Sequence, residues 1–265
     1  MEFGVEIYAI AVAAGLLAGV INTLAGSGSL VALAALIAIG LPAPVANGTN
    51  RVGVLIQSVV ALKTMSAHGT KKPEGMGWIL ASATVGALGG AWLATGVDAE
   101  ALEWIIIGVL WAMLLLVLLR PGDWLRKRSE EQKGKATVGK VLIFVLVGAW
   151  GGFLQAGVGI LLLGALVLAA GKNVIEATAI KMVVVLVYTV GALAIFIAYD
   201  QVHWELGLVM GVGQGVGGWM GGRFAATSPR APIWIRRLLI AVILLAAAEL
   251  MGLLPWIRAW IGGFY

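Results

Sequence analysis

Residues 22–51 read NTLAGSGSLVALAALIAIGLPAPVANGTNR, a largely apolar stretch with polar groups near both of its ends. Three asparagines, several hydroxyl residues and a closing arginine flank a run that is apolar enough to lie in lipid. Polar and charged groups inside a membrane are costly to dehydrate, and they usually have a function. The stretch therefore predicts a membrane segment with a binding role.

The composition of the whole chain indicates an integral membrane protein. Of the 265 residues, 61% are hydrophobic and 12% are charged, and the mean hydropathy is +1.00. A soluble domain needs about a quarter charged residues to cover its surface. Most of the 38 glycines lie inside apolar runs, which is typical of close helix packing in lipid. The net charge of +5 comes from a few cationic loops, so it does not indicate nucleic-acid binding.

Ten apolar segments follow one another in two groups of five. Lipid leaves the edges of open strands unpaired, so we expect every segment to be a helix or a helix fragment. The second and seventh segments are about 14 residues or ~21 Å long, less than the ~30 Å hydrocarbon core, which predicts discontinuous or re-entrant helices. The segments lie near 4–24, 28–41, 48–67, 76–96, 101–119, 138–156, 158–171, 174–198, 205–222 and 233–252.

The two groups are similar in sequence, which indicates a duplication. GLLAGVINTLAGSGSLVALAALIAIGL pairs with GAWGGFLQAGVGILLLGALVLAAGK when the second copy receives a two-residue gap. GALGGAWLAT at Gly86 pairs with GWMGGRFAAT at Gly218, at nearly the same spacing. We predict a first membrane repeat at 1–119, a cytoplasmic linker at 120–137 and a second membrane repeat at 138–265.

Loop charges predict that the two repeats are inverted relative to each other. The stretch 120–135 holds six Lys and Arg residues, which places it in the cytoplasm and both termini outside. The loop with Lys71 and Lys72 corresponds to the acidic loop at 200–205, and the acidic loop at 98–103 corresponds to the arginine-rich stretch 223–237. Equivalent loops thus have opposite charge. Inverted repeats are a transporter architecture with the binding site near the midplane.

NTLAGSGSL followed by GLPAPVANGTNRVGVL resembles the first repeat of the TauE/SafE-type sulfite and organosulfonate exporters, the TSUP permeases, which have an INTLAGGGS…GLPP..ANATNR pattern. GGFLQAGVGILLLGALVL and ATAIKMVVVLVYTVGALAIF resemble the second repeat of that family, so the likeness spans nearly the whole chain. The resemblance implies a secondary transporter of small anions, such as sulfite, thiosulfate or sulfoacetate, in a prokaryotic cell membrane. Val158 stands where the first repeat has Ser27, so the two half-sites are expected to be unequal.

Donors for a dehydrated anion gather at equivalent turns of the two repeats. Glycines let the backbone approach a ligand closely, and a helix N-terminus after such a turn offers free N–H groups and a positive dipole end. Two such turns facing each other would form a cage for an oxyanion; the alternative is that the small residues only allow helices to pack. The candidate residues are Asn22, Thr23, Gly26, Ser27, Gly28 and Ser29 in the first repeat and Gln155, Gly157 and Gly159 in the second.

The third segment of each repeat adds a cation near its start. Asn47, Asn50 and Arg51 open this segment in the first repeat, and Lys181 is the repeat partner of Asn50. Asn47 and Asn50 are candidate substrate-binding residues, although for Asn47 alone we favour capping of the helix over ligand contact. Arg51 and Lys181 either attract the anion or snorkel to the membrane surface.

Further along the same segments lie Gln57 and Ser58, with Tyr188 and Thr189 as their counterparts. They either line the transport path or satisfy a neighbouring helix by hydrogen bonding. Both interpretations are open at the level of sequence.

Other functional classes find little support in the sequence. The chain has no cysteine, its two histidines lie at segment ends, and no H-E-x-x-H or Walker A motif occurs. We therefore expect no metal, no cofactor and no enzymatic activity. A passive anion channel and an organic carboxylate permease remain alternatives. Coupling to protons would need a titratable group in the pathway, and Glu176 is the acid nearest to the predicted site.

Overall fold

The computed structural model describes residues 4–68, 76–102, 104–105, 136–172, 174–228, 234 and 237. These ranges contain helices and no strand, which confirms the all-α prediction. The linker at 120–135, most of the fifth segment and nearly all of the tenth lie outside the described residues. The elements are α1 (Val5–Leu24), α2 (Ser29–Ala38), α3 (Ala43–Ala67), α4 (Gly77–Thr95), α6 (Val138–Phe153), α7 (Val158–Gly164), the π-helix η2 (Ala165–Ala169), α8 (Val174–Ala198) and α9 (Trp204–Thr227).

The helices have the length and surface of membrane-spanning segments. Val5–Leu24, Gly77–Thr95 and Ile175–Ala198 are each long and apolar enough to cross a bilayer. Large apolar side chains such as Trp92 and Val212 point outward from the bundle and are 61% and 62% exposed. A soluble protein rarely exposes such a surface, whereas lipid favours it. The integral membrane class is therefore confirmed.

The same order of elements occurs in both halves of the chain. Helices α3 and α8 contain 25 residues each and begin at Ala43 and Val174. Each half also starts with a long helix and a short one, and continues after the 25-residue helix with another long helix. Two copies of one ancestral unit would produce this order, as the sequence repeat predicts.

Each half packs its first helix against the fourth helix of the other half. Gly15 of α1 lies so close to α9 that an added Cβ would meet the Met210 carbonyl oxygen at 2.3 Å. Gly86 of α4 lies equally close to α6, where an added Cβ would meet the Val145 carbonyl oxygen at 2.0 Å. Small residues allow this close approach of helix backbones in lipid. The two halves of the chain are therefore interlocked and do not form two separate packing units.

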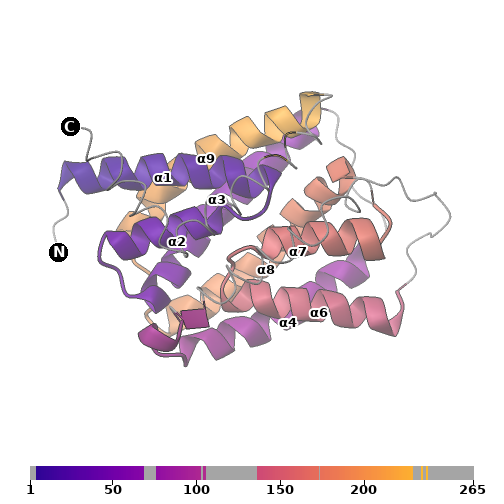
Figure 1. Ribbon diagram of the computed structural model, residues 1–265, viewed down its shortest axis with the longest axis horizontal. Coiled ribbons are helices and arrows are strands. Elements are labelled where there is room, and N and C mark those ends of the chain that lie inside the picture. The colour runs from indigo at the N-terminus through magenta and orange to yellow at the C-terminus, as the bar shows by residue number, and fades with distance from the viewer. Residues whose placement is uncertain are drawn as a thin grey trace, which may run out of the picture.

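The short helices form hairpins with the helices before them. In Figure 1, α1 with α2 and α6 with α7 enter the molecule from opposite sides, and their turns lie near its centre. With 10 residues, α2 measures about 15 Å and cannot cross the hydrocarbon core. The turn before it is buried, with Ala25 and Ser27 at 0% exposure. This opposite entry is what inverted repeats require, and the orientation of each repeat in the bilayer stays a prediction.

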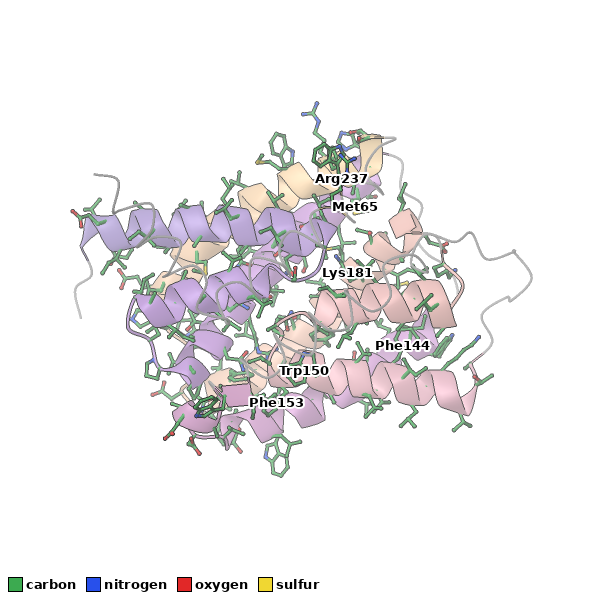
Figure 2. All side chains as sticks on the ribbon, in the orientation of Figure 1. Met65, Phe144, Trp150, Phe153, Lys181 and Arg237 are labelled. Atoms are coloured by element: carbon green, nitrogen blue, oxygen red, sulfur yellow. The ribbon has the colours of Figure 1, made fainter. Side chains whose placement is uncertain are left out.

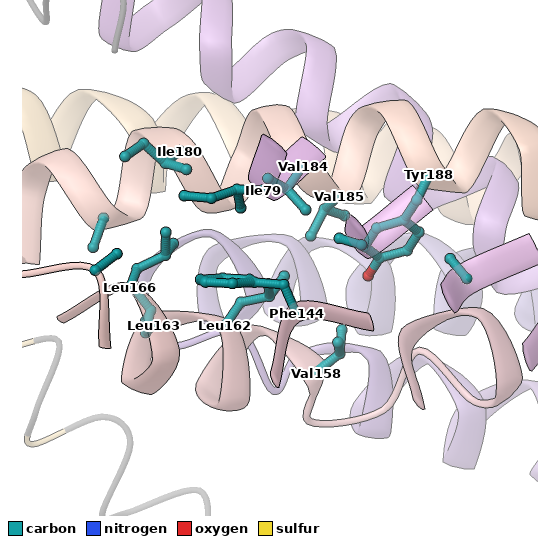
Figure 3. Packing of buried hydrophobic residues seen from close by; sticks show 14 of the residues in the cluster. Ile79, Phe144, Val158, Leu162, Leu163, Leu166, Ile180, Val184, Val185 and Tyr188 are labelled. Carbon is teal, nitrogen blue, oxygen red and sulfur yellow. The ribbon is translucent and has the colours of Figure 1, made fainter. Parts of the chain in front are cut away.

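An apolar cluster joins α6, α7, η2 and α8 to α4 (Figure 3). Phe144 lies in it and meets the Trp78 ring edge-to-face at 5.4 Å between centroids. Tyr188 lies at one end of this cluster, where its apolar ring packs with the core and its hydroxyl faces the first turn of α7 near Val158 (Figure 3). The cluster thus holds the second hairpin against α4 and α8.

Some predicted helix ends differ from the structure. Helix α3 begins at Ala43 rather than near residue 48, because Pro42 precedes the helix and Pro44 lies in its first turn, where proline needs no hydrogen-bonded N–H. Asn47 therefore lies inside α3, and the prediction that it caps this helix is wrong. Helix α9 likewise continues to Thr227, beyond the predicted end at 222.

Cysteine labelling tests the predicted orientation, since the chain has no native cysteine. Helices α4 and α6 run parallel, so exposed Asp98 after α4 and exposed Thr137 before α6 lie at opposite ends of the pair. In intact cells, an impermeant thiol reagent is expected to label Asp98→Cys and to leave Thr137→Cys unlabelled. Both variants should label after permeabilisation. Labelling of both in intact cells contradicts the inverted topology.

Candidate functional site

The two hairpin turns meet by direct backbone contact in the interior. The Gly159 amide donates a hydrogen bond to the Gly26 carbonyl over 3.0 Å. An added Cβ on Gly159 would lie 2.3 Å from the Gly26 Cα, so neither position has space for a side chain. Gly26 also has a φ of +82°, which glycine adopts without strain. The glycines that were predicted to approach a ligand thus approach each other in this conformation, and the backbone cage stays a prediction.

Lys181 of α8 reaches the end of α1 (Figure 2). Its Nζ donates to the carbonyl oxygens of Asn22 at 3.0 Å and Thr23 at 2.8 Å. The Asn22 amide in turn donates to the Gln57 Oε1 atom, and the Gln57 amide donates to the Thr23 hydroxyl, both at 3.1 Å. The last turn of α1 is therefore bound by α3 and α8 together.

Arg51 of α3 makes the equivalent contact with the end of α6. Its Nη1 atom donates to the Gly151 carbonyl at 3.2 Å and to the Gln155 Oε1 atom at 3.1 Å, and its Nη2 atom donates to the Gly152 carbonyl. The guanidinium group stacks over the Phe196 ring at 4.5 Å.

Asn47, one turn earlier on α3, donates to the next carbonyl of α6. Its amide lies 2.7 Å from the carbonyl oxygen of Phe153. The carbonyl groups of the last turn of α6 are therefore bound by two side chains of α3. This contact is the role that the structure gives Asn47 in place of capping its own helix.

Each half of the chain thus supplies a cation that binds the C-terminal carbonyl groups of the first helix in the other half. A helix C-terminus carries a partial negative charge, so it is a favourable place for a buried cation. Arg51 and Lys181 are both 0% exposed, so the snorkelling alternative is wrong. The buried polar residues of the described chain include no carboxylate, and the interior therefore carries excess positive charge.

Several buried donors on the helices that carry these cations and on the first hairpin have no partner within the described residues. Asn50 uses its side-chain oxygen to accept from Gln214 at 3.1 Å, while its amide nitrogen is unpaired. Most buried polar groups in proteins are hydrogen-bonded, so these exceptions need an explanation such as a missing ligand. The unpaired donors on the first hairpin, α3 and α8 are Ser27 Oγ, Ser29 Oγ, Asn50 Nδ2, Arg51 Nε, Ser58 Oγ, Tyr188 Oη and Thr189 Oγ1. Trp78 Nε1 and Thr84 Oγ1 of α4 are unpaired as well.

Three further residues that were predicted for the site contact other parts of the protein. Gln57 hydrogen-bonds α1, which favours the structural interpretation of this residue in the conformation described here. Tyr188 lies beside Arg51 and Gln155. Gly28 packs tightly on α1, where an added Cβ would meet the Ala18 carbonyl oxygen at 1.9 Å.

Two residues that contact Asn50 or Arg51 were not predicted from the sequence. Gln214 is buried, and Gly53 packs against its side chain. It is the one amide in the run GVGQGVGG, and this isolation is a usable signal. Phe196 had no signal, because its contact with Arg51 depends on tertiary structure.

The fold and the buried polar groups together indicate a membrane transport protein. Short helices whose turns meet inside the molecule are a feature that such proteins use to build a binding site. The chain belongs to the sulfite exporter TauE/SafE family, whose model matches residues 11–250. This match confirms the resemblance found in the sequence.

Curated relatives are membrane transporters by name. The chain is 32% identical over 254 residues to the probable membrane transporter protein ORF9 of a Sinorhizobium species, with 94% of each chain covered. It is 28% identical over 239 residues to the probable membrane transporter protein YfcA of Escherichia coli K12, covering 89% of this chain and 86% of YfcA. A Haemophilus influenzae probable membrane transporter is 25% identical, covering 88% and 91%. No solved structure matches the chain.

Proposed function

We propose that this protein is a secondary transporter that moves small anions across the cell membrane by alternating access. Sulfur oxyanions and organosulfonates are the proposed substrates, in accordance with the family description. The observation that carries the proposal is the buried centre, which holds Arg51 and Lys181 and, within the described residues, no carboxylate. A dehydrated anion needs both positive charge and hydrogen-bond donors, and this centre supplies both.

The unpaired donors support a binding place beside the hairpin turns. Ser27 and Ser29 border the turn that contacts Gly159, and Asn50 is adjacent to Arg51 in sequence. An oxyanion can accept several hydrogen bonds at once, so it would satisfy groups that are otherwise buried without a partner. Separation of the two turns would give the anion access from either side. The contact between Gly26 and Gly159 is then the closed form of this centre.

Transport by the purified protein in liposomes tests this function. Labelled sulfite, thiosulfate and sulfoacetate should exchange with the same unlabelled anion inside the vesicles, whereas malate should not compete. Exchange that depends on anion on the opposite side supports alternating access. Flux that follows the gradient with no such dependence indicates a channel, and preferred exchange of malate indicates an organic carboxylate permease.

Replacing Ser27 or Ser29 by alanine separates ligand binding from protein stability. A buried hydroxyl without a partner does not stabilise the fold, so thermal stability should be unchanged or slightly higher. Loss of a hydrogen bond to an anion should weaken affinity by about 1.4 kcal/mol, or about tenfold. Anion affinity and melting temperature are measured on the same detergent-solubilised samples.

Ser82→Ala is the matched control, because Ser82 is also buried but its hydroxyl donates to the Trp78 carbonyl of its own helix at 2.6 Å. This variant should keep the wild-type affinity. If Ser27→Ala and Ser29→Ala both bind every tested anion as the wild type does, the hydroxyl groups do not contact the substrate.

A further inference from the structure

Lys181 and Arg51 occupy similar positions but are chemically different. Each lies about two turns from the start of its helix and binds the end of the first helix of the other repeat. A guanidinium keeps its proton under all ordinary conditions, whereas a lysine amine can lose its proton when it is buried. The centre therefore has one permanent cation and one cation that can become neutral.

The hydrogen bonds of Lys181 suit both of its protonation states. A neutral amine has two N–H donors, and the two carbonyl groups of Asn22 and Thr23 accept them. The ammonium has a third donor. Within the described residues this third donor has no partner, so protonation creates both the charge and the free N–H that an anion requires.

The surroundings of Lys181 contain no counter-ion in the described part of the chain. The helices packed against α8 are α1, α3, α4, α6, α7 and η2, and the structure shows no hydrogen bond or ion pair between Lys181 and a titratable group on any of them. Glu176 of α8 itself pairs with Lys172 at 2.6 Å. The titratable and charged groups on these elements are Glu6 and Tyr8 of α1, Arg51 and Lys63 of α3 with His68 at its end, Lys140 of α6, and Glu176 and Tyr188 of α8, whereas α4, α7 and η2 have none.

We propose that Lys181 is the proton-carrying residue that couples anion transport to a proton gradient. The inference rests on the proposed anion transport and adds its coupling ion. On one side of the membrane, the amine lone pair takes a proton from water and the ammonium then binds the anion. On the other side the anion leaves, the N–H bond breaks, the electron pair stays on nitrogen and the proton passes to water. Anion and proton therefore move together.

This mechanism assigns no proton-carrying role to Glu176, which was the sequence-based candidate. Glu176 lies in the first turn of α8 and is a third exposed. It forms an i,i+4 ion pair with Lys172, which is an ordinary surface arrangement. Lys181, by contrast, is fully buried and touches a helix of the other repeat, so its charge is sensitive to any separation of the repeats.

Two fluxes measured in the same proteoliposomes test the proposal. Exchange of labelled thiosulfate at equal pH reports anion transport alone, and thiosulfate accumulation driven by a pH gradient reports coupling. The wild type should show both fluxes, and the lumen should become more acidic in step with anion uptake. Lys181→Arg, which keeps the charge permanently, should retain part of the exchange and lose accumulation driven by the pH gradient. Exposed Lys63→Arg should retain both.

Proton uptake by the detergent-solubilised wild type provides a measurement that needs no variant. Thiosulfate binding in weak buffer should take up about one proton per anion at a pH where the free protein has lost the Lys181 proton, as linkage requires. The inference is overturned if the wild type exchanges thiosulfate but a pH gradient drives no accumulation. It is also overturned if Lys181→Arg accumulates thiosulfate in proportion to its remaining exchange. Either result leaves the proposed function intact. Absence of exchange in the wild type overturns the proposed function itself.

Discussion

Gly159→Ala is expected to abolish transport and to destabilise the protein more than an ordinary core substitution. The added methyl group would lie 2.3 Å from the Gly26 Cα and 2.7 Å from its carbonyl oxygen, and both are backbone atoms that no rotamer change can move. Overpacking typically costs about 1–3 kcal/mol, and this backbone-to-backbone overlap should reach the upper end, about 3 kcal/mol. Thiosulfate exchange in proteoliposomes and melting temperature in detergent measure the two effects.

Gly89→Ala is the matched control for this substitution. Gly89 is likewise a helical glycine, in α4, but an added Cβ there meets no atom within 4 Å. This variant should transport normally and be as stable as the wild type or slightly more stable, because alanine has the higher helix propensity. Wild-type exchange by a folded Gly159→Ala protein contradicts the close contact between the two turns.

Arg51→Met should also have a large effect, because it removes the side chain that links the two repeats near the end of α6. The carbonyl groups of Gly151 and Gly152 and the amide oxygen of Gln155 all lose a charged donor. Hydrogen bonds to charged groups contribute about 1.5–3 kcal/mol each, so we expect a loss of about 3–5 kcal/mol in the free energy of unfolding. Denaturant titration in detergent measures this loss.

Two further variants identify the cause of that effect. Arg51→Lys retains the charge but not the several donors, so it should restore part of the stability. Lys63→Met removes an exposed cation from the same helix and should leave stability within about 0.5 kcal/mol of the wild type. If Arg51→Met is as stable as the wild type, the buried guanidinium does not hold the repeats together.

Much of the fold follows from the sequence because lipid restricts the possible structures. Apolar runs must be helices, and a run the length of α2 is too short to cross the bilayer, so both features could be predicted from composition and length alone. The start of α3 was predicted less accurately. GLPAPVANG looks like a loop because of its prolines, but Pro42 and Pro44 occupy the positions just before and within a first turn, where proline is accepted.

The sequence predicted residues of the candidate site but not the contacts that these residues make. The repeat alignment selected Asn22, Gln155 and Lys181 because polar residues in lipid are rare. It could not show that Lys181 binds the carbonyl groups of α1, because this contact joins residues 158 and 159 positions apart in the chain. Gln214 was overlooked for the same reason, since only tertiary packing brings it to Asn50.

The interlocked packing of α1 on α9 has a consequence for biosynthesis. Helix α1 ends at Leu24 and α9 begins at Trp204, so 179 residues separate the partners in the order of synthesis. Ribosomes add about 5–20 residues per second, so the nascent first helix waits about 10–40 s in the bilayer before its partner is made. During this interval its glycine face lies against lipid or an insertion factor. Helix α1 is one of the three described helices that are apolar enough to span a membrane unaided, and α9 is not among them. The helix that must wait is therefore the one that tolerates lipid alone, and the later helix inserts where a partner is already present.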